Sequence, residues 1–333
     1  MHNLQPIEAP APPPSRSELA GRFRDPKTLL SFAVLAVLLV VVLTHVRFDY
    51  QESLRAMSRT NLGFYALAIL VFYFSFVVRA VRWEVLLRNS GEESRFGGLF
   101  HIIILAWFAN CILPAKMGDF YRAYLLRRRT TISGSHGLGT IVSERIIDFL
   151  ILVTLLIVTG LISFRLSLPH RYEAAFAAGI GIAAALLVGL IGLRFTGGRI
   201  SRLLPSRFRG HAGRFKGGLL NAFRANLPLL VALTVVVWVA ESARLYLVIQ
   251  ALPLHLALTP PQVMFIALVA SLLTTIPALP GGLVIVEGGI IAVLISFGLT
   301  SSEGLSVAIL DRLISYWSLI LVGLVVFLTT HDR

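Results

Sequence analysis

The sequence has little charge and almost no cysteine. Of its 333 residues 14% are charged and 56% are hydrophobic, whereas soluble domains carry about 25% charged residues. This composition excludes an ordinary soluble domain and predicts an integral membrane protein. The single cysteine, Cys111, excludes an internal disulfide, and because it lies in an apolar run we interpret it as a small packing residue.

Motifs of the common catalytic machineries are also missing. The sequence contains no G-x-x-x-x-G-K-[ST] loop and no G-x-S-x-G elbow. Its eight histidines are scattered, and His101, His136 and His211 have no metal-ligand spacing. We therefore expect no built-in ATP-driven motor, no cofactor and no metal.

Acidic residues are scarce, with 17 against 30 basic residues and a net charge of +13. Such an excess often indicates nucleic-acid binding. Here, however, the bases gather in loops between apolar runs, where the positive-inside rule places them on the cytoplasmic side. Residues 194–227 carry eight bases and no acid. We therefore predict no nucleic-acid partner, and a multi-pass protein of the cell (inner) membrane with both termini in the cytoplasm.

Long apolar runs dominate what is present. A membrane-spanning helix needs about 20 apolar residues, and six segments qualify: residues 28–46, 62–81, 141–164, 174–193, 228–252 and 310–329. Three shorter runs, 99–113, 263–279 and 283–299, are broken by proline and glycine. These predict two re-entrant segments or, alternatively, further full spans giving eight or more. The predicted fold class is an all-α polytopic membrane protein, with residues 1–27 as a disordered cytoplasmic tail and 28–333 as one transmembrane domain.

Similar charged residues and similar Pro- and Gly-containing breaks recur in the two halves of the chain at nearly the same spacing. Arg82 and Arg244 lie in similar apolar surroundings 162 positions apart, and the pair Glu144-Arg145 resembles Asp311-Arg312 at a spacing of 167. A Pro- and Gly-containing break lies between the landmarks of each half. The charge of the loops places the first break toward the cytoplasm and the second toward the outside. We therefore predict two inverted-topology repeats, about 28–167 and 168–333, an arrangement typical of transporters.

Charged residues within apolar segments are the candidate functional residues. An ionisable group at membrane depth costs a few kcal/mol or more, so it is usually paired or functional. The candidates are the bases Arg79, Arg82, Lys116, Arg122, Arg145, Arg244 and Arg312 and the acids Asp119, Glu144, Asp148, Glu241, Glu287 and Asp311.

For several of these residues both a functional role and a purely structural role stay open. Arg79 and Arg82 either contact a substrate or extend to lipid headgroups at the cytoplasmic end of their helix. Glu241 and Arg244, three positions apart on one helix face, form either a self-neutralising pair or part of a site. Glu287 has no nearby partner in sequence, which favours a functional or long-range paired role.

Three ordered motifs carry a family resemblance. They are Arg79-x-x-Arg82-Trp83-x-x-Leu86-Leu87, then Asn110-x-x-Leu113-Pro114-Ala115-x-x-Gly118-Asp119-x-x-Arg122, then Glu144-Arg145-x-x-Asp148. With Pro277-x-x-Pro280-Gly281-Gly282-x-x-x-x-Glu287 and Asp311-Arg312, they resemble the transmembrane domain of lysylphosphatidylglycerol synthases over about residues 30–330. The resemblance adds Asn110 to the candidate substrate-binding residues.

The resemblance implies a flippase-like function. In full-length members this domain moves an aminoacylated phospholipid between leaflets, and a separate C-terminal domain synthesises it. This chain ends at Arg333, just after its last span, so we expect no synthase activity. We expect a lipid translocase that works by alternating access, with arginines binding an anionic or phosphate-bearing headgroup.

Two alternatives to a translocase remain open. One is an integral-membrane enzyme that uses the same acids on a lipid or polyprenyl carrier. The other is a non-catalytic membrane partner of a separate synthase or glycosyltransferase. Membrane lipids are the expected partners, and a separate lipid-modifying enzyme and a homo-oligomer stay open as further ones.

Overall fold

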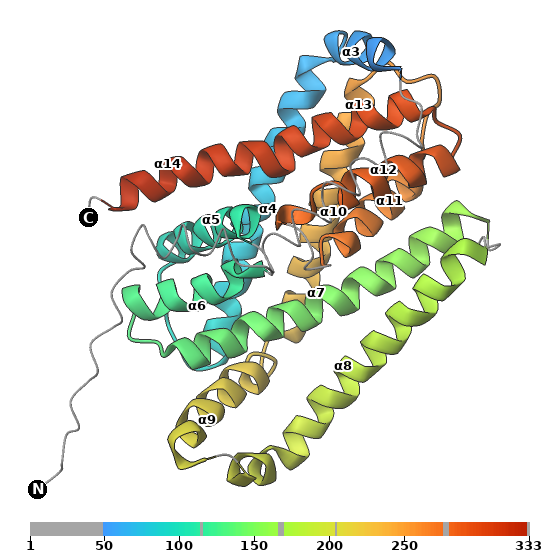
Figure 1. The fold of residues 1–333 in the computed structure, drawn as a ribbon. Coiled ribbons are helices and arrows are strands. Elements are labelled where there is room, and N and C mark those ends of the chain that lie inside the picture. The colour runs from blue at the N-terminus through green and yellow to red at the C-terminus, as the bar shows by residue number, and fades with distance from the viewer. Residues whose placement is uncertain (1–48, 114–115, 166–169, 204, 276–279, 332–333) are drawn as a thin grey trace, which may run out of the picture.

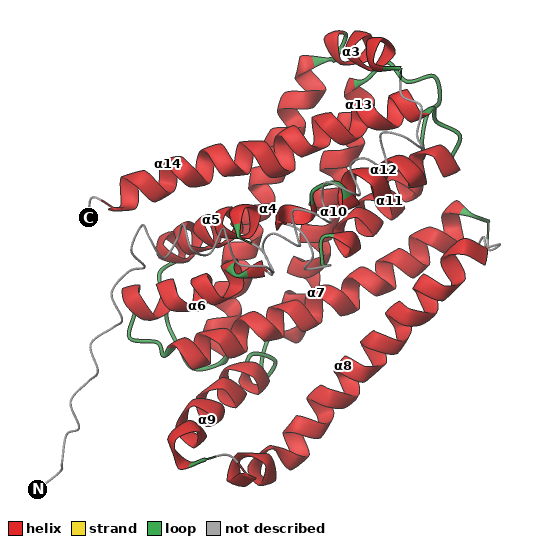
Figure 2. Cartoon of the chain, in the orientation of Figure 1, coloured by secondary structure: helices red, strands yellow, loops and turns green. Residues whose placement is uncertain are grey.

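The computed structural model describes residues 49–113, 116–165, 170–203, 205–275 and 280–331, and every regular element within them is helical (Figure 2). The predicted tail (1–27) and first span (28–46) lie outside the described residues. The elements follow the order α3 (Tyr50–Ser58), α4 (Leu62–Asn89), α5 (Phe96–Ile112), α6 (Gly118–Arg129), α7 (Gly134–Ser163), α8 (His170–Leu203), α9 (Ser206–Asn221), α10 (Leu227–Ala251), α11 (Pro260–Leu273), η2 (Pro280–Gly282), α12 (Ile285–Ser296), α13 (Ser301–Arg312), the π-helical segment η3 (Leu313–Ser318) and α14 (Leu319–His331).

Five stretches of the described residues are long and apolar enough to cross a membrane. They are Leu62–Asn89, Gly134–Ser163, Phe176–Phe195, Leu227–Ala251 and Ser301–Thr330, the last being α13, η3 and α14 in one continuous helix. They coincide with five of the six predicted spans. The prediction of an all-α polytopic membrane protein is confirmed.

The short apolar runs form short helices. The lengths of α5, α11 and α12 are 17, 14 and 12 residues. At about 1.5 Å per residue none exceeds about 26 Å, less than the hydrocarbon core of about 30 Å. Together with α6 they form two hairpins, α5–α6 and α11–α12. Helices of this length are compatible with the re-entrant interpretation, and the total number of full spans stays a prediction.

Each hairpin has a strained break. Lys116 lies at φ 52° before α6, and Gly281, Gly282 and Val284 lie at φ 58°, 69° and 69° before α12. Positive φ is readily adopted by glycine but is unusual for lysine and a genuine outlier for the β-branched valine. Such strain is found where the surrounding structure fixes a special geometry, often at a functional site.

Helices α4 and α10 run antiparallel through the middle of the molecule (Figure 1). At one end the Asn61 amide donates to the Ala251 carbonyl at 2.8 Å, and at the other the Asn89 side chain donates to the Ala222 carbonyl at 3.0 Å. The α5–α6 hairpin and α7 pack on one side of this pair, and α11, α12 and α13 on the other. The order of one long helix, two short helices and a second long helix thus occurs twice, in α4–α7 and in α10–α14.

Local sequence determines several helix starts. The Asn61 side chain accepts from the amides of Gly63 and Phe64 and caps α4, because the first turn of a helix has unpaired N–H groups. Thr300 and Glu303 form a reciprocal capping box at the start of α13. These caps give the charged residues farther along each helix a fixed register.

The outer surface is apolar, as a lipid-facing surface must be. Large exposed side chains include Leu70, Phe74, Val188 and Leu321. Helix α8 lies beside α7 at the periphery (Figure 1) and buries little of its surface. Several charged side chains of α4, α7, α10 and α13 are buried instead, among them Arg82, Asp148, Arg244 and Asp311.

Candidate functional site

A cavity of about 510 Å³ lies between the two groups of helices. Its wall includes residues of both hairpins and of α4, α7, α10, α13 and η3. Ten of the fourteen predicted site residues line it: Arg79, Asn110, Lys116, Asp119, Arg145, Asp148, Glu241, Arg244, Asp311 and Arg312. The other four, Arg82, Arg122, Glu144 and Glu287, form ion pairs with these residues or with one another. The cavity therefore brings together residues more than 200 positions apart.

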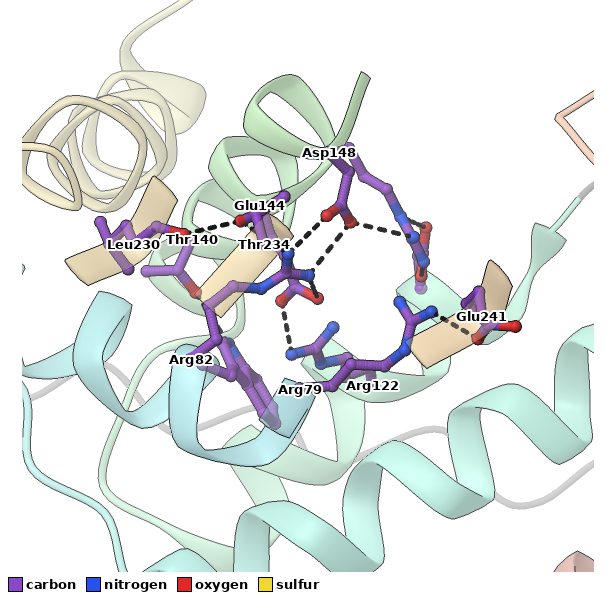
Figure 3. A network of polar contacts seen from close by, with 12 residues as sticks. Arg79, Arg82, Arg122, Thr140, Glu144, Asp148, Leu230, Thr234 and Glu241 are labelled. Atoms are coloured by element: carbon purple, nitrogen blue, oxygen red, sulfur yellow. Dashed lines mark hydrogen bonds and ion pairs between the residues drawn. The ribbon is translucent and has the colours of Figure 1, made fainter. Parts of the chain in front are cut away.

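Arg82 is the centre of a buried ion cluster (Figure 3). Its guanidinium contacts Asp148 at 2.5 Å and Glu144 at 2.8 Å, both on α7. It also donates to the Thr234 hydroxyl on α10 at 2.9 Å. This side chain thereby connects α4, α7 and α10.

Arg122 completes the cluster from α6. It binds the second oxygen of Glu144 at 2.7 Å, so that one carboxylate holds two guanidinium groups. Its charge lies 3.8 Å from the ring centre of Trp83, a favourable cation–π contact. The Trp83 indole in turn donates to the Thr140 hydroxyl at 3.2 Å. Arg122 and Arg82 thus fix α6 and α4 against α7.

Arg79 and Arg82 do not extend to headgroups. Arg79 is 4% exposed and Arg82 is fully buried, so the snorkelling interpretation is wrong for both. Arg79 donates to Glu241 on α10 at 2.9 Å (Figure 3). Its guanidinium also lies 4.7 Å from the ring centre of Trp107.

Glu241 and Arg244 contact each other at 3.3 Å, in agreement with their spacing along α10. Each also has a partner on another helix. Glu241 binds Arg79 on α4, and Arg244 binds Asp311 at the end of α13. The pair is therefore one link of a longer chain and not a self-contained unit.

The first break is held by a two-pronged ion pair. Arg145 donates to Asp119 through Nε at 2.9 Å and Nη2 at 2.7 Å, which joins α7 to the first turn of α6. The Asn110 side chain accepts from the Gly118 amide at 2.8 Å, which joins the end of α5 to the same turn. Asn110 thus shapes the break as well as lining the cavity.

The second break is held in a similar way. Arg312 donates to Glu287 on α12 at 2.7 Å and to the Gly281 carbonyl at 2.7 Å. The long-range partner expected for Glu287 is therefore Arg312. Tyr316, one turn farther along, donates to the Cys111 carbonyl at 3.0 Å and so connects η3 to the end of α5.

Five aromatic residues of the cavity wall were not among the predicted site residues. They are Phe72, Trp107, Phe149, Trp238 and Tyr316. Tyr316 follows Arg312 by four residues, a spacing that places both on one helix face. The two tryptophans have no comparable signal, because an aromatic residue in an apolar run usually belongs to the core or the lipid surface.

The lining suits an amphiphilic ligand. Guanidinium and ammonium groups favour phosphate and carboxylate oxygens, while Phe72, Phe149, Leu152 and Trp238 supply an apolar wall. A lipid headgroup with attached chains combines these two properties.

Comparison with known proteins agrees with this architecture. The family described as the lysylphosphatidylglycerol synthase TM region matches residues 28–323. A UPF0104 membrane protein of Methanocaldococcus jannaschii is 34% identical over 220 residues, which are 66% of this chain and 93% of that protein. A UPF0104 membrane protein of Pyrococcus horikoshii is 23% identical over 304 residues, 82% of this chain and 89% of that protein.

A further relative carries an enzyme name. The glycosyltransferase AglD of Haloferax volcanii is 24% identical over 331 residues, which cover 86% of this chain and 51% of that protein. The family match extends over most of the described helices and includes every residue of the cavity wall. The chain therefore belongs to the family of the lysylphosphatidylglycerol synthase transmembrane region.

Proposed function

We propose that this protein is a lipid translocase whose central cavity accepts a phosphate-bearing headgroup and opens alternately to the two sides of the membrane. The observation that carries the proposal is the cavity itself, which is charged, at the centre of an apolar protein, and lined by both halves of the chain. A headgroup bound there would keep its hydrocarbon chains among apolar side chains or in the bilayer.

Matching ion pairs support two inverted repeats. Arg145 and Arg312 are 167 positions apart, and their partners Asp119 and Glu287 are 168 apart. Each arginine thus joins the long helix of its half to the re-entrant hairpin of the same half. Two such latches, one in each half, are what alternating access needs, because each controls one side of the cavity.

The buried pairs repeat as well. Arg82 binds Glu144 in the first half, and Arg244 binds Asp311 in the second, at counterpart positions. Because α4 and α10 are antiparallel, the two halves have opposite orientations in the membrane. We place the first break toward the cytoplasm, with both termini in the cytoplasm of a cell-membrane protein, since the basic loop residues favour that side.

A second candidate function follows from the similarity to AglD. That glycosyltransferase contains a region similar to this chain in about half of its length. A lipid-linked substrate could be bound in the same cavity and modified there or by a partner enzyme. The translocase is favoured because, among the described residues of the cavity wall, the arginines and carboxylates are bound to one another and leave no separate pair of these groups for acid–base catalysis.

Reconstitution in liposomes tests both candidates. The purified protein would be incorporated with nitrobenzoxadiazole-labelled phosphatidylglycerol, and membrane-impermeant dithionite would quench the label in the outer leaflet. Without lipid movement, only the label in the outer leaflet, about half of the total, is quenched. We expect the wild type to raise the quenched fraction clearly above half, and Arg145→Gln to return it to about half. Arg88→Gln is the matched control, because Arg88 pairs with Glu84 at an exposed position outside the cavity.

The same liposomes also test the alternative function, an enzyme that modifies the lipid. Mass spectrometry of the recovered lipid would show whether its covalent structure has changed. Unchanged leaflet distribution with a modified lipid would overturn the translocase and favour the enzyme. Equal quenching in the presence of wild type and of Arg145→Gln would show that the movement does not use this cavity.

A further inference from the structure

The charges in and around the cavity balance except for one. Six arginines and six carboxylates of the site are joined in ion pairs that connect α4, α6, α7, α10, α12 and α13. Lys116 lines the same cavity and forms no ion pair within the described part of the chain. The site therefore carries one uncompensated positive charge.

The uncompensated charge is found at the first break and has no equivalent at the second. Lys116 and Val284 are the non-glycine residues with positive φ that precede α6 and α12, at 52° and 69°. They are 168 positions apart, the same spacing as Asp119 and Glu287. One break thus presents an ammonium group where the other presents an isopropyl group.

The arginines are less available to a ligand than this lysine. Arg145 uses both prongs of its guanidinium on Asp119, and Arg312 binds Glu287 and the Gly281 carbonyl. An ammonium group, by contrast, has three donors on a flexible stem. Lys116 can therefore bind a phosphate oxygen without breaking a pair that holds the fold together.

We propose that Lys116 is the phosphate-binding residue of the cavity, and that the site selects a ligand with one net negative charge, namely a lipid phosphodiester. The inference rests on the proposed function and adds the charge of the headgroup to it. A monoanion neutralises the site, whereas a zwitterion leaves the lysine uncompensated and a dianion buries an excess negative charge. The apolar wall favours a lipid over free phosphate as the source of the anion.

Equilibrium binding in an uncharged detergent tests this without requiring transport. The probes are dihexanoyl phosphatidylglycerol, a monoanion, dihexanoyl phosphatidylcholine, a zwitterion, and inorganic phosphate. Binding would be followed by calorimetry and by the fluorescence of Trp107 and Trp238, which line the cavity. We expect the wild type to prefer the monoanionic lipid by roughly tenfold, which is what one charge-assisted contact provides.

Variants that change the charge at position 116 test whether Lys116 causes the preference for the monoanionic lipid. Lys116→Gln should reduce it to less than about threefold, and Lys116→Arg should retain it, provided that both melt within a few degrees of the wild type. Lys216→Gln is the matched control, because Lys216 lies on α9 outside the cavity wall.

Several outcomes would overturn the proposal. A preference that survives in Lys116→Gln, or that is lost equally in Lys216→Gln, excludes the assigned role. If Lys116→Gln does not fold, loss of the preference in a folded Lys116→Arg variant excludes it. Inorganic phosphate that binds as tightly as the lipid and displaces it overturns the lipid source.

Binding and translocation can fail separately. Dithionite-detected movement of labelled phosphatidylglycerol with no preference in the binding assay refutes the role of Lys116 and leaves the translocase standing. A Lys116-dependent preference with no movement supports the phosphate site and refutes the translocase.

Discussion

Arg79 and Glu241 form a 2.9 Å ion pair, and they lie 162 residues apart, the same spacing as Arg82 and Arg244. In the proposed inverted repeats they are counterparts, and a residue meets its own counterpart only where a two-fold axis passes between them. Because α4 and α10 are antiparallel, that axis is perpendicular to the helices. For inverted repeats it lies in the membrane plane, so the Arg79–Glu241 contact would lie at the point about which the halves rock.

The orientation of the helices can be tested with single cysteines. In a Cys111→Ser background, Glu93→Cys should react with an impermeant maleimide only from the cytoplasm and Ala257→Cys only from outside. Both positions are exposed, and each follows the C-terminal end of its helix, α4 or α10. Because the two helices are antiparallel, these ends lie on opposite sides. Reaction of both from the same side would contradict the inverted arrangement.

The two latches should control opposite sides of the cavity. With Ser271→Cys as a reporter in the cavity wall and Cys111→Ser as background, Arg145→Gln frees Asp119 and should increase labelling from the cytoplasm. Arg312→Gln frees Glu287 and should increase labelling from outside. An equal increase from both sides in either variant would show that the pairs hold the fold rather than gate it.

Arg82 should contribute more to stability than any exposed arginine. Arg82→Met leaves Glu144 and Asp148 with less compensation in the buried cluster, and removal of one partner from such a cluster costs about 3 to 5 kcal/mol. Arg88→Met breaks an exposed i,i+4 pair with Glu84, worth less than about 1 kcal/mol. Melting temperatures in detergent should fall by many degrees for the first and hardly at all for the second.

Gly118 allows the first hairpin to close. A Cβ atom added there would lie 2.0 Å from the Ala106 carbonyl oxygen and 2.5 Å from the Asn110 side-chain oxygen. Gly118→Ala should therefore push α6 away from α5, with lower thermal stability and loss of lipid movement. Gly97→Ala on α5 meets no atom within 4 Å, so it should behave as the wild type; equal behaviour of the two variants would refute this close approach.

Glu241 and Arg244 should not rescue each other. In an isolated pair, removal of both charges is milder than removal of one. Here the Glu241→Ala/Arg244→Ala double variant leaves Arg79 and Asp311 without these partners. Its melting temperature should be no higher than that of either single variant, and a clearly more stable double variant would show that the links to Arg79 and Asp311 carry little energy.

The sequence predicts the spans well because a run of about 20 apolar residues has few alternatives in a membrane. It also predicts which charged residues gather at the cavity, since their cost at membrane depth requires a partner or a role. The partners themselves depend on tertiary structure. Spacing along one helix gives the contact between Glu241 and Arg244, but not the contacts to Arg79 and Asp311, which lie 162 and 67 positions away.

Helices outside the spans were not predicted. Residues 47–61 were left between two predicted spans and 194–227 were treated as a loop, but these segments contain α3, the end of α8 and α9. These helices are polar or basic, so they lack the long apolar run on which span prediction depends. Asp49, whose side chain caps α3 by accepting from the Gln51 and Glu52 amides, is a local signal that would have indicated the first of them.

The balance of arginines and carboxylates has an electrical consequence. A membrane potential of 100 mV does work of about 2.3 kcal/mol on each elementary charge that crosses it. The paired network has no net charge, so moving it as a whole across the potential requires no net electrical work. With Lys116 as the one excess cation, a cavity loaded with a monoanion would be neutral and the empty cavity would carry one positive charge. The resting potential would then act on the return of the empty protein and not on the step that carries the lipid.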